Sequence, residues 1–123
     1  MANQWKIQRV PGVAPGRSSG SAFGPLTWSV ATAGVYDGDI AEQTRLTLLE
    51  LDRLLQDQGT GKQNLLSISI YLSDLKEKPV FDDIWVEWIG PEPAHWPQRA
   101  CVQAELENGI RVEVVAVASR PVE

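Results

Sequence analysis

The spacing of apolar residues changes along this chain, and the change limits what the chain can fold into. Apolar and polar residues alternate in residues 4–10 and 26–32, as in half-buried strands. Between residues 40 and 58 the apolar residues recur every three or four positions instead, which predicts an amphipathic helix. The apolar stripe of this helix contains Leu48, Leu51, Leu54 and Leu55. The chain therefore combines strands with a long helix.

Signals at both ends support a helix over residues 40–58. Asp39 is a suitable N-cap, and Glu42 stands three residues later, in the position of a capping box. Gly59 follows the last turn, where glycine commonly ends a helix. We therefore expect one long helix that packs through its leucine stripe.

The second half of the chain contains a further strand and a further helix. Residues 65–72 alternate, which predicts a strand with one apolar face and one small, polar face. The apolar face contains Leu66, Ile68, Ile70 and Leu72. Pro79 opens the second helix, and Gly90 with Pro91 ends it. The apolar stripe of this helix contains Phe81, Ile84, Trp85 and Trp88.

Residues 99–118 predict two strands joined by a turn at residues 107–109. A hairpin with this three-residue turn separates apolar from polar side chains, whereas a two-residue turn mixes them. The expected pairs are Val102 with Val114, Ala104 with Val112, and Leu106 with Ile110. In this register Arg99, Cys101 and Glu113 share one face.

The order of elements predicts a single α+β domain over residues 1–123, with two helices packed on one face of a mixed sheet. The other face of the sheet combines small polar, charged and apolar side chains. It is expected to carry Ser67, Ser69, Tyr71, Cys101, Gln103, Glu113, Val115 and Val117. Such a face is too mixed for a core and too apolar for open solvent, so we expect other subunits to cover it.

Composition narrows the possible partners and compartments. The 123 residues carry a formal net charge of −5, which disfavours nucleic-acid binding. No apolar run approaches the roughly 20 residues of a membrane span, and the N-terminus lacks a signal-peptide pattern, so a cytoplasmic protein is expected. The single cysteine, Cys101, excludes an internal disulfide. Cys101 and His95 are the only soft ligands, which excludes a structural zinc site.

Several segments resemble the Rid family, the reactive intermediate deaminases also called YjgF or L-PSP proteins. They are AEQT followed by LLELDRLLQDQG, then LLSISIYLSDL, DDIWVEW, PQRACVQAEL and VEVVAVA. The segment GRSSGSAFGPLTWS is similar to a divergent branch in which an arginine, here Arg17, replaces the usual pocket tyrosine. The resemblance implies a chorismate-mutase-like fold with a six-stranded mixed sheet, assembled as a homotrimer with pockets between subunits.

The resemblance also implies an activity, the hydrolysis of enamines and imines of small carboxylic acids to 2-keto acids and ammonia without a metal or organic cofactor. It assigns carboxylate binding to Arg99, because a guanidinium matches a carboxylate bidentately. It also implies that the backbone of Cys101 contacts the ligand and that Glu113 positions water. Arg17 is a further candidate for ligand binding, at a second anionic group. Asp82 stands where the family has an asparagine.

Other interpretations of these residues stay open. Arg99 can be a surface arginine, Glu113 a cross-strand partner of Gln103, and Cys101 a small buried side chain. His95 is either a base at the pocket or a solvated loop residue. The leading hypothesis is the deaminase, and the alternative is a non-catalytic binder of keto acids or related metabolites at the same pocket between subunits. The acidic net charge argues against the endoribonuclease activity often attached to the family.

Overall fold

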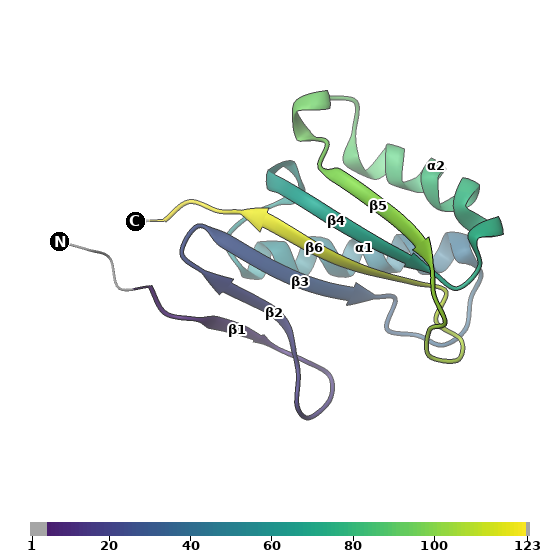
Figure 1. Ribbon diagram of the computed structural model, residues 1–123, viewed down its shortest axis with the longest axis horizontal. Helices are drawn as coiled ribbons and strands as arrows, with labels where there is room; N and C mark the ends of the chain where they lie inside the picture. Colours follow the sequence, from purple (N-terminus) through teal and green to yellow (C-terminus); the bar gives the residue numbers. More distant parts are fainter. Residues whose placement is uncertain (1–4, 123) are drawn as a thin grey trace.

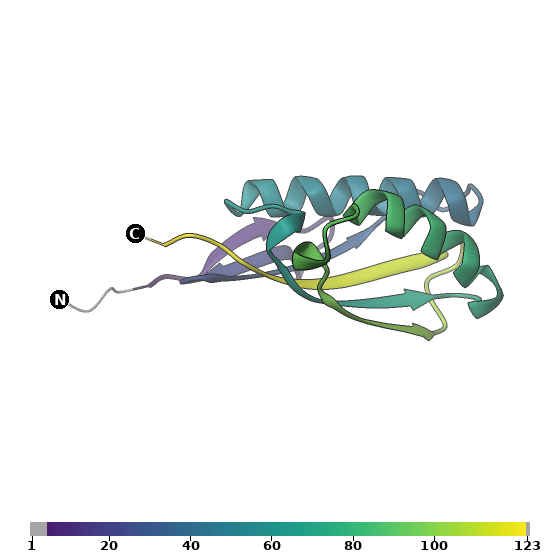
Figure 2. The same cartoon turned by 90° about the horizontal axis from the view of Figure 1, so that it is seen from above.

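The computed structural model describes residues 5–122, in which six strands form one mixed sheet with both α-helices on one face (Figures 1 and 2). The strand order is β1-β2-β3-β6-β4-β5. The elements are β1 (Gln8–Pro11), β2 (Ser18–Phe23), β3 (Leu26–Thr32), α1 (Ile40–Asp57), β4 (Leu65–Leu72), α2 (Lys78–Ile89), β5 (Gln98–Gln103) and β6 (Val112–Ser119). Neither α-helix combines the length and the apolar composition needed to cross a bilayer. The predicted α+β arrangement is confirmed.

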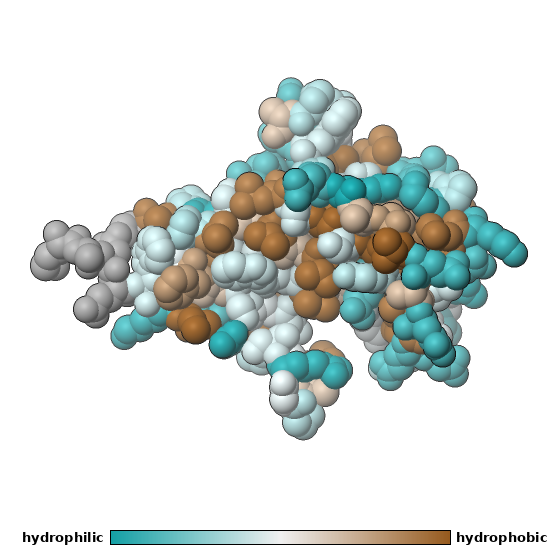
Figure 3. Space-filling model, in the orientation of Figure 1, coloured by the Kyte–Doolittle hydropathy of each residue, from teal (hydrophilic) through white to brown (hydrophobic). Residues whose placement is uncertain are grey.

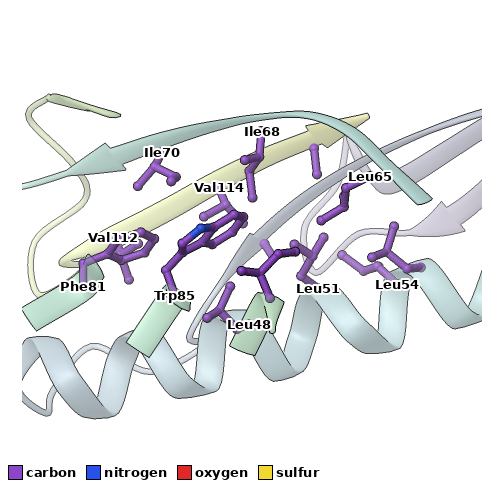
Figure 4. Close-up of a cluster of buried hydrophobic side chains, with 14 of the residues drawn as sticks. Leu48, Leu51, Leu54, Leu65, Ile68, Ile70, Phe81, Trp85, Val112 and Val114 are labelled. Carbon is purple, nitrogen blue, oxygen red and sulfur yellow. The ribbon is translucent and has the colours of Figure 1, made fainter. Parts of the chain in front are cut away.

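The ends of α1 follow the local signals in its sequence. The Asp39 side chain accepts a hydrogen bond from the backbone N of Glu42 at 2.9 Å. Gly59 follows the last turn with a φ of 81°, a left-handed conformation that favours glycine. The leucine stripe is buried and points toward the sheet (Figure 4). The strand predicted over residues 4–10 is shorter, because β1 starts at Gln8, and Gln4 lies outside the described residues.

The second helix, α2, connects β4 to β5 across the same face of the sheet (Figure 1). It starts at Lys78, with Pro79 in its first turn, and Gly90 ends it with a φ of 85°. Phe81 and Trp85 are buried and belong to the same core as the α1 leucines (Figure 4). This helix therefore completes one continuous core between the sheet and both helices.

The predicted hairpin of residues 99–118 is wrong. β5 runs parallel to β4, while β6 lies between β3 and β4 and is antiparallel to both. The connection through α2 explains the difference, because a helical crossover returns the chain to the starting end of the sheet and lets β5 run parallel to β4. Alternation alone cannot reveal this, because it indicates that a segment is a strand but not which strand lies beside it. The apolar residues on both faces of β6 are typical of a central strand.

This topology separates residues that the hairpin placed together. Cys101 pairs with Ile70, which pairs with Val114, and this row faces the helices. Glu113 pairs with Tyr71 in the neighbouring row, so its side chain lies on the opposite face. The expectation that Arg99 and Cys101 share a face with Glu113 is therefore wrong.

The sheet face without helices, which we call the open face, is partly apolar as expected. Ser67, Ser69, Tyr71, Glu113, Val115 and Val117 lie on it, whereas Cys101 and Gln103 belong to rows that face the helices. Trp28, Val30 and Val102 add exposed apolar surface, and Figure 3 shows apolar side chains gathered over the middle of this face. The open face thus has the mixed composition that the sequence predicts, although some of its residues differ from those expected.

One strand register also differs from the prediction. Leu65 is 6% exposed and Leu66 is 48% exposed, so Leu65 and not Leu66 faces the core. The pairing between β4 and β6 shifts between Leu65 and Ser67. An irregularity of this kind adds one residue and changes the face on which the preceding side chains lie.

Candidate functional site

Arg99 lies on the edge strand β5, on the face covered by α2. Its Nη2 donates a hydrogen bond to Oδ1 of Asp82 at 2.7 Å. Its Cζ lies 5.7 Å from the ring centre of Phe81 and 5.6 Å from that of Trp85, within the range of cation–π contacts. Because positions 81, 82 and 85 share one side of a helix, α2 presents both rings and the carboxylate to the same guanidinium. The Arg99 side chain is only 21% exposed, and these contacts fix its position. It therefore differs from a free surface arginine.

Asp82 links Arg99 to a second cation. Its Oδ2 lies 2.7 Å from Nζ of Lys78, one turn earlier in α2. Burial is the largest single influence on this carboxyl and raises its pKa, but the hydrogen bonds and charges of Lys78 and Arg99 together outweigh it, so the pKa is lowered. Asp82 is therefore ionised at neutral pH. We call Lys78, Asp82 and Arg99 the charge cluster.

The guanidinium of Arg99 keeps donors that no other group uses. Within residues 5–122, only its Nη2 makes a hydrogen bond, and Nε and Nη1 make none. Nη2 shares one edge of the planar guanidinium with Nε and another edge with Nη1, so the edge that Asp82 does not occupy still presents two N–H donors to the oxygens of a carboxylate. The protein thus fixes one edge of Arg99 and leaves a second edge for a ligand.

Cys101 lies two residues after Arg99 on the same face and packs against the core. Burial raises the pKa of its thiol, although the nearby charges of Arg99 and Lys78 lower it in part. The thiol is therefore protonated at neutral pH and is a poor nucleophile. This environment favours the interpretation of Cys101 as a small, partly buried side chain.

Glu113 lies on the open face, where its backbone pairs with those of Tyr71 and Thr32. Among residues 5–122 its carboxylate forms no ion pair. One strand, β4, separates Glu113 on β6 from Arg99 on β5, and Arg99 points to the opposite face. A small ligand therefore cannot contact Arg99 and Glu113 of the same chain.

Arg17 lies in the exposed loop between β1 and β2, at the other edge of the sheet from Arg99. His95 is also exposed, at the end of the short 3-10 helix Pro93–His95 that precedes β5. The described chain thus does not bring Arg17, Arg99 and Glu113 together. A pocket that contains all three needs more than one copy of the chain.

Two hollows lie elsewhere on the surface. The first, with a volume of about 360 Å³, is lined by Ile7, Arg9, Ser21, Ala22, Phe23 and Trp28. The second, about 490 Å³, lies among the loops around Arg111 and is mostly polar. Neither contains a residue of the charge cluster, and no three metal-binding side chains of residues 5–122 lie together. The candidate site is therefore the surface of β5 and α2 around Arg99.

Sequence analysis missed the roles of Asp82 and Lys78 in this site. Their spacing of four residues at the start of the second helix is a signal for an ion pair on one helix face. The contact with Arg99 has no such local signal, because it joins α2 to a strand that starts nine residues after that helix ends. Asp82 is significant because it is the group that holds the proposed carboxylate-binding arginine.

Comparisons with known proteins agree on one group. The family model described as Endoribonuclease L-PSP matches residues 22–120. The RutC family protein YoaB of Escherichia coli (strain K12) is 36% identical over 84 residues, which cover 68% of this chain and 72% of YoaB. TdcF of the same strain, whose name proposes a reactive intermediate deaminase, is 22% identical over 122 residues, covering 94% of this chain and 95% of TdcF. The crystal structure of NMB1025 of Neisseria meningitidis, a member of the YjgF protein family, is 29% identical and superposes with a TM-score of 0.85, over 96% of this chain and 98% of NMB1025.

Proposed function

Because the chain belongs to the Rid family, also called the YjgF or L-PSP family, and has its chorismate-mutase-like fold, we propose that it hydrolyses enamines or imines of small carboxylic acids. The products are 2-keto acids and ammonia. The observation that carries this proposal is the Arg99 guanidinium, held by α2 on one edge and free to bind a carboxylate on another. The name of TdcF supports the same reaction class at lower identity.

Arg99 binds the substrate carboxylate in this proposal. A charge-assisted hydrogen-bonded pair of this kind contributes about 1.5–3 kcal/mol. The rings of Phe81 and Trp85 limit the positions that the guanidinium can take, so less freedom is lost when the ligand binds. The backbone of Cys101, two residues further along the edge strand, contacts the same ligand.

The reaction needs water and a group that transfers protons. The water oxygen attacks the carbon of the C=N bond while Glu113 takes a proton from the water. Glu113 passes this proton to the nitrogen, which gives a carbinolamine. The hydroxyl proton then moves to the nitrogen as the C–N bond breaks, so the nitrogen leaves as ammonia and the carbon keeps the oxygen as the keto group. An enamine first becomes an imine by gaining a proton at carbon and losing one from nitrogen. The proposal requires no metal or organic cofactor for these steps.

The active assembly in this proposal is a homotrimer. Arg17 and Arg99 lie at opposite edges of one sheet, and Glu113 lies on the open face. In a closed ring of identical chains, each chain contacts the next through two different surfaces. We propose that in such a ring Arg17 and Glu113 of neighbouring chains meet an Arg99, and that the neighbouring chains cover the apolar open face. Every pocket is then formed between protomers.

A coupled assay tests the activity. An amino-acid dehydratase generates the enamine in place, and keto-acid release is measured with and without this protein. We expect the Arg99→Ala variant to lose most of the rate enhancement and Arg99→Lys to recover only part of it, because an ammonium lacks the planar pair of donors. An Arg99→Ala variant as active as the unmodified protein would eliminate the proposal.

A second candidate function is non-catalytic binding of keto acids or related metabolites at the same site. The observation that favours it is that, among residues 5–122, the Cys101 thiol is protonated, Glu113 lies on the other face, and the groups beside Arg99, Asp82 and Lys78, are already paired with each other. A binder is stabilised thermally by keto acids without turnover of the imine. Stabilisation with turnover identifies the enzyme.

The name of the matching family model includes endoribonuclease, but we do not propose this activity for the chain. The net charge of −5 provides no favourable field for a phosphate backbone. RNA cleavage that persists in highly purified protein, at a constant ratio of activity to protein, would contradict this view.

A further inference from the structure

The charge cluster has a net charge that matches one carboxylate. Lys78 and Arg99 are positive and Asp82 is negative, so the three side chains together carry +1. The neighbouring acid, Glu77, does not change this balance, because both of its oxygens are bound by Nη1 of Arg111 at 3.0 and 3.1 Å. A ligand with one carboxylate therefore neutralises the cluster.

We propose that Asp82 is a specificity-determining residue that makes the site prefer ligands with one carboxylate over ligands with two. This inference rests on the proposed function, in which Arg99 binds the ligand. The first carboxylate of a ligand occupies the free edge of Arg99 and cancels the charge of the cluster. A second carboxylate on the same ligand finds no uncompensated cation in the cluster and is repelled by Asp82. In the proposed trimer, the positive charge of Arg17 from a neighbouring chain is matched by the negative charge of Glu113.

The geometry allows the charge of Asp82 to be tested apart from its structural role. Oδ1 of Asp82 accepts the hydrogen bond from Arg99, and an asparagine at this position keeps an oxygen that accepts the same bond. The Asp82→Asn substitution therefore preserves the orientation of the guanidinium and removes one negative charge. The cluster then carries two positive charges, which suits a dianion.

Arg17 does not affect this comparison. It lies at the other edge of the sheet, so within one chain its charge is not part of the cluster. If a neighbouring protomer brings Arg17 to the site, it contributes the same charge to every variant. Differences between the variants in their preference for one or two carboxylates therefore come from Lys78 and Asp82.

The test is calorimetric titration of the purified full chain with two probes, 2-oxobutyrate, which has one carboxylate, and 2-oxoglutarate, which has two. In the unmodified protein we expect the monocarboxylate to bind more tightly. In Asp82→Asn we expect the ratio of the two dissociation constants to shift about fivefold toward the dicarboxylate, the order of magnitude for one charge some 8 Å away in partly exposed surroundings. In Lys78→Gln the ratio should move in the opposite direction.

The matched control is Asp83→Asn. Asp83 is the next residue of α2 and is exposed, so this substitution changes the net charge of the chain equally without touching the cluster. We expect it to leave the ratio unchanged. Thermal unfolding of each variant checks that the fold is kept, and Lys78→Gln provides an independent measurement if Asp82→Asn is unstable.

The outcomes separate this inference from the proposed function. If the unmodified protein binds the monocarboxylate through Arg99 but Asp82→Asn and Lys78→Gln leave the ratio unchanged, the inference is overturned and the proposed function stands. If neither acid binds, or if Arg99→Ala binds both acids as well as the unmodified protein does, both are overturned. Opposite shifts in the two variants, with none in Asp83→Asn, support the inference.

Discussion

The contact between Arg99 and Asp82 is the centre of the proposed site, and a double-mutant cycle measures its strength. The two substitutions are Arg99→Met, which keeps most of the apolar stem, and Asp82→Ala. A charge-assisted hydrogen bond contributes about 1.5–3 kcal/mol when buried. Because the two side chains are 21% and 32% exposed, solvent screens the pair, and we expect a coupling energy of about 1 kcal/mol.

The assay is urea unfolding of the four proteins at one fixed protein concentration, since association changes apparent stability. Arg99→Met alone should destabilise the chain by about 1–2 kcal/mol, because it also loses the contacts with the rings of Phe81 and Trp85. For a chain of this length the melting temperature then falls by about 4–8 °C.

An exposed ion pair in α1 serves as the comparison for this cycle. Nη1 of Arg53 lies 2.9 Å from Oδ2 of Asp57, and the two side chains are 54% and 46% exposed. The same cycle on this pair should give about 0.3–0.5 kcal/mol. A coupling between Arg99 and Asp82 below that of this exposed pair would refute the reasoning that α2 holds the guanidinium.

Three further predictions concern pH, assembly and the thiol. The pKa of Asp82 is lowered in the folded chain, so its contribution to stability is present above the ordinary value of 3.8 and is lost as the pH falls through the folded pKa. The difference in stability between the unmodified protein and Asp82→Asn should therefore shrink on acidification. A difference that stays constant with pH would contradict this. Val117→Glu places a charge at a half-buried position of the open face and should dissociate the proposed trimer, as measured by light scattering. The control Val86→Glu, at an exposed position of α2, should leave the trimer intact. A Val117→Glu variant that is still a trimer would show that the open face is not part of the interface. The Cys101 thiol has a raised pKa, so iodoacetamide should alkylate it more slowly than a free cysteine at pH 8, and Cys101→Ser should keep its activity; rapid alkylation with loss of turnover would point to a nucleophilic role.

Local sequence signals were sufficient for α1. Asp39, the leucine stripe and Gly59 specify where the helix starts, which face it buries and where it ends, and each acts within a few residues of itself. The same holds for the start of α2 near Pro79. Helices form from contacts within one segment, so their pattern is visible without knowledge of the rest of the chain.

The sequence did not show in the same way which strands lie beside one another. The alternation in residues 99–118 correctly shows two strands, yet it is compatible with a hairpin and with the observed arrangement, in which β4 separates β5 from β6. The irregularity near Leu66 has a similar origin, because strict alternation cannot show where one strand slips against another. Both depend on hydrogen bonds between segments that are far apart in the sequence.

By itself, the sequence determined both helices, most of the strands, the α+β class and the mixed character of the open face. Through its resemblance to the Rid family, it also led to the prediction that Arg99 binds a carboxylate. Only the tertiary structure decided that Glu113 lies on the other face from Arg99 and that Asp82 pairs with both Arg99 and Lys78. The physical reason is the range of the interactions. Periodicity and capping act over a few residues, whereas the face on which a side chain lies and the charges it meets follow from which strands become neighbours after α2 crosses the sheet.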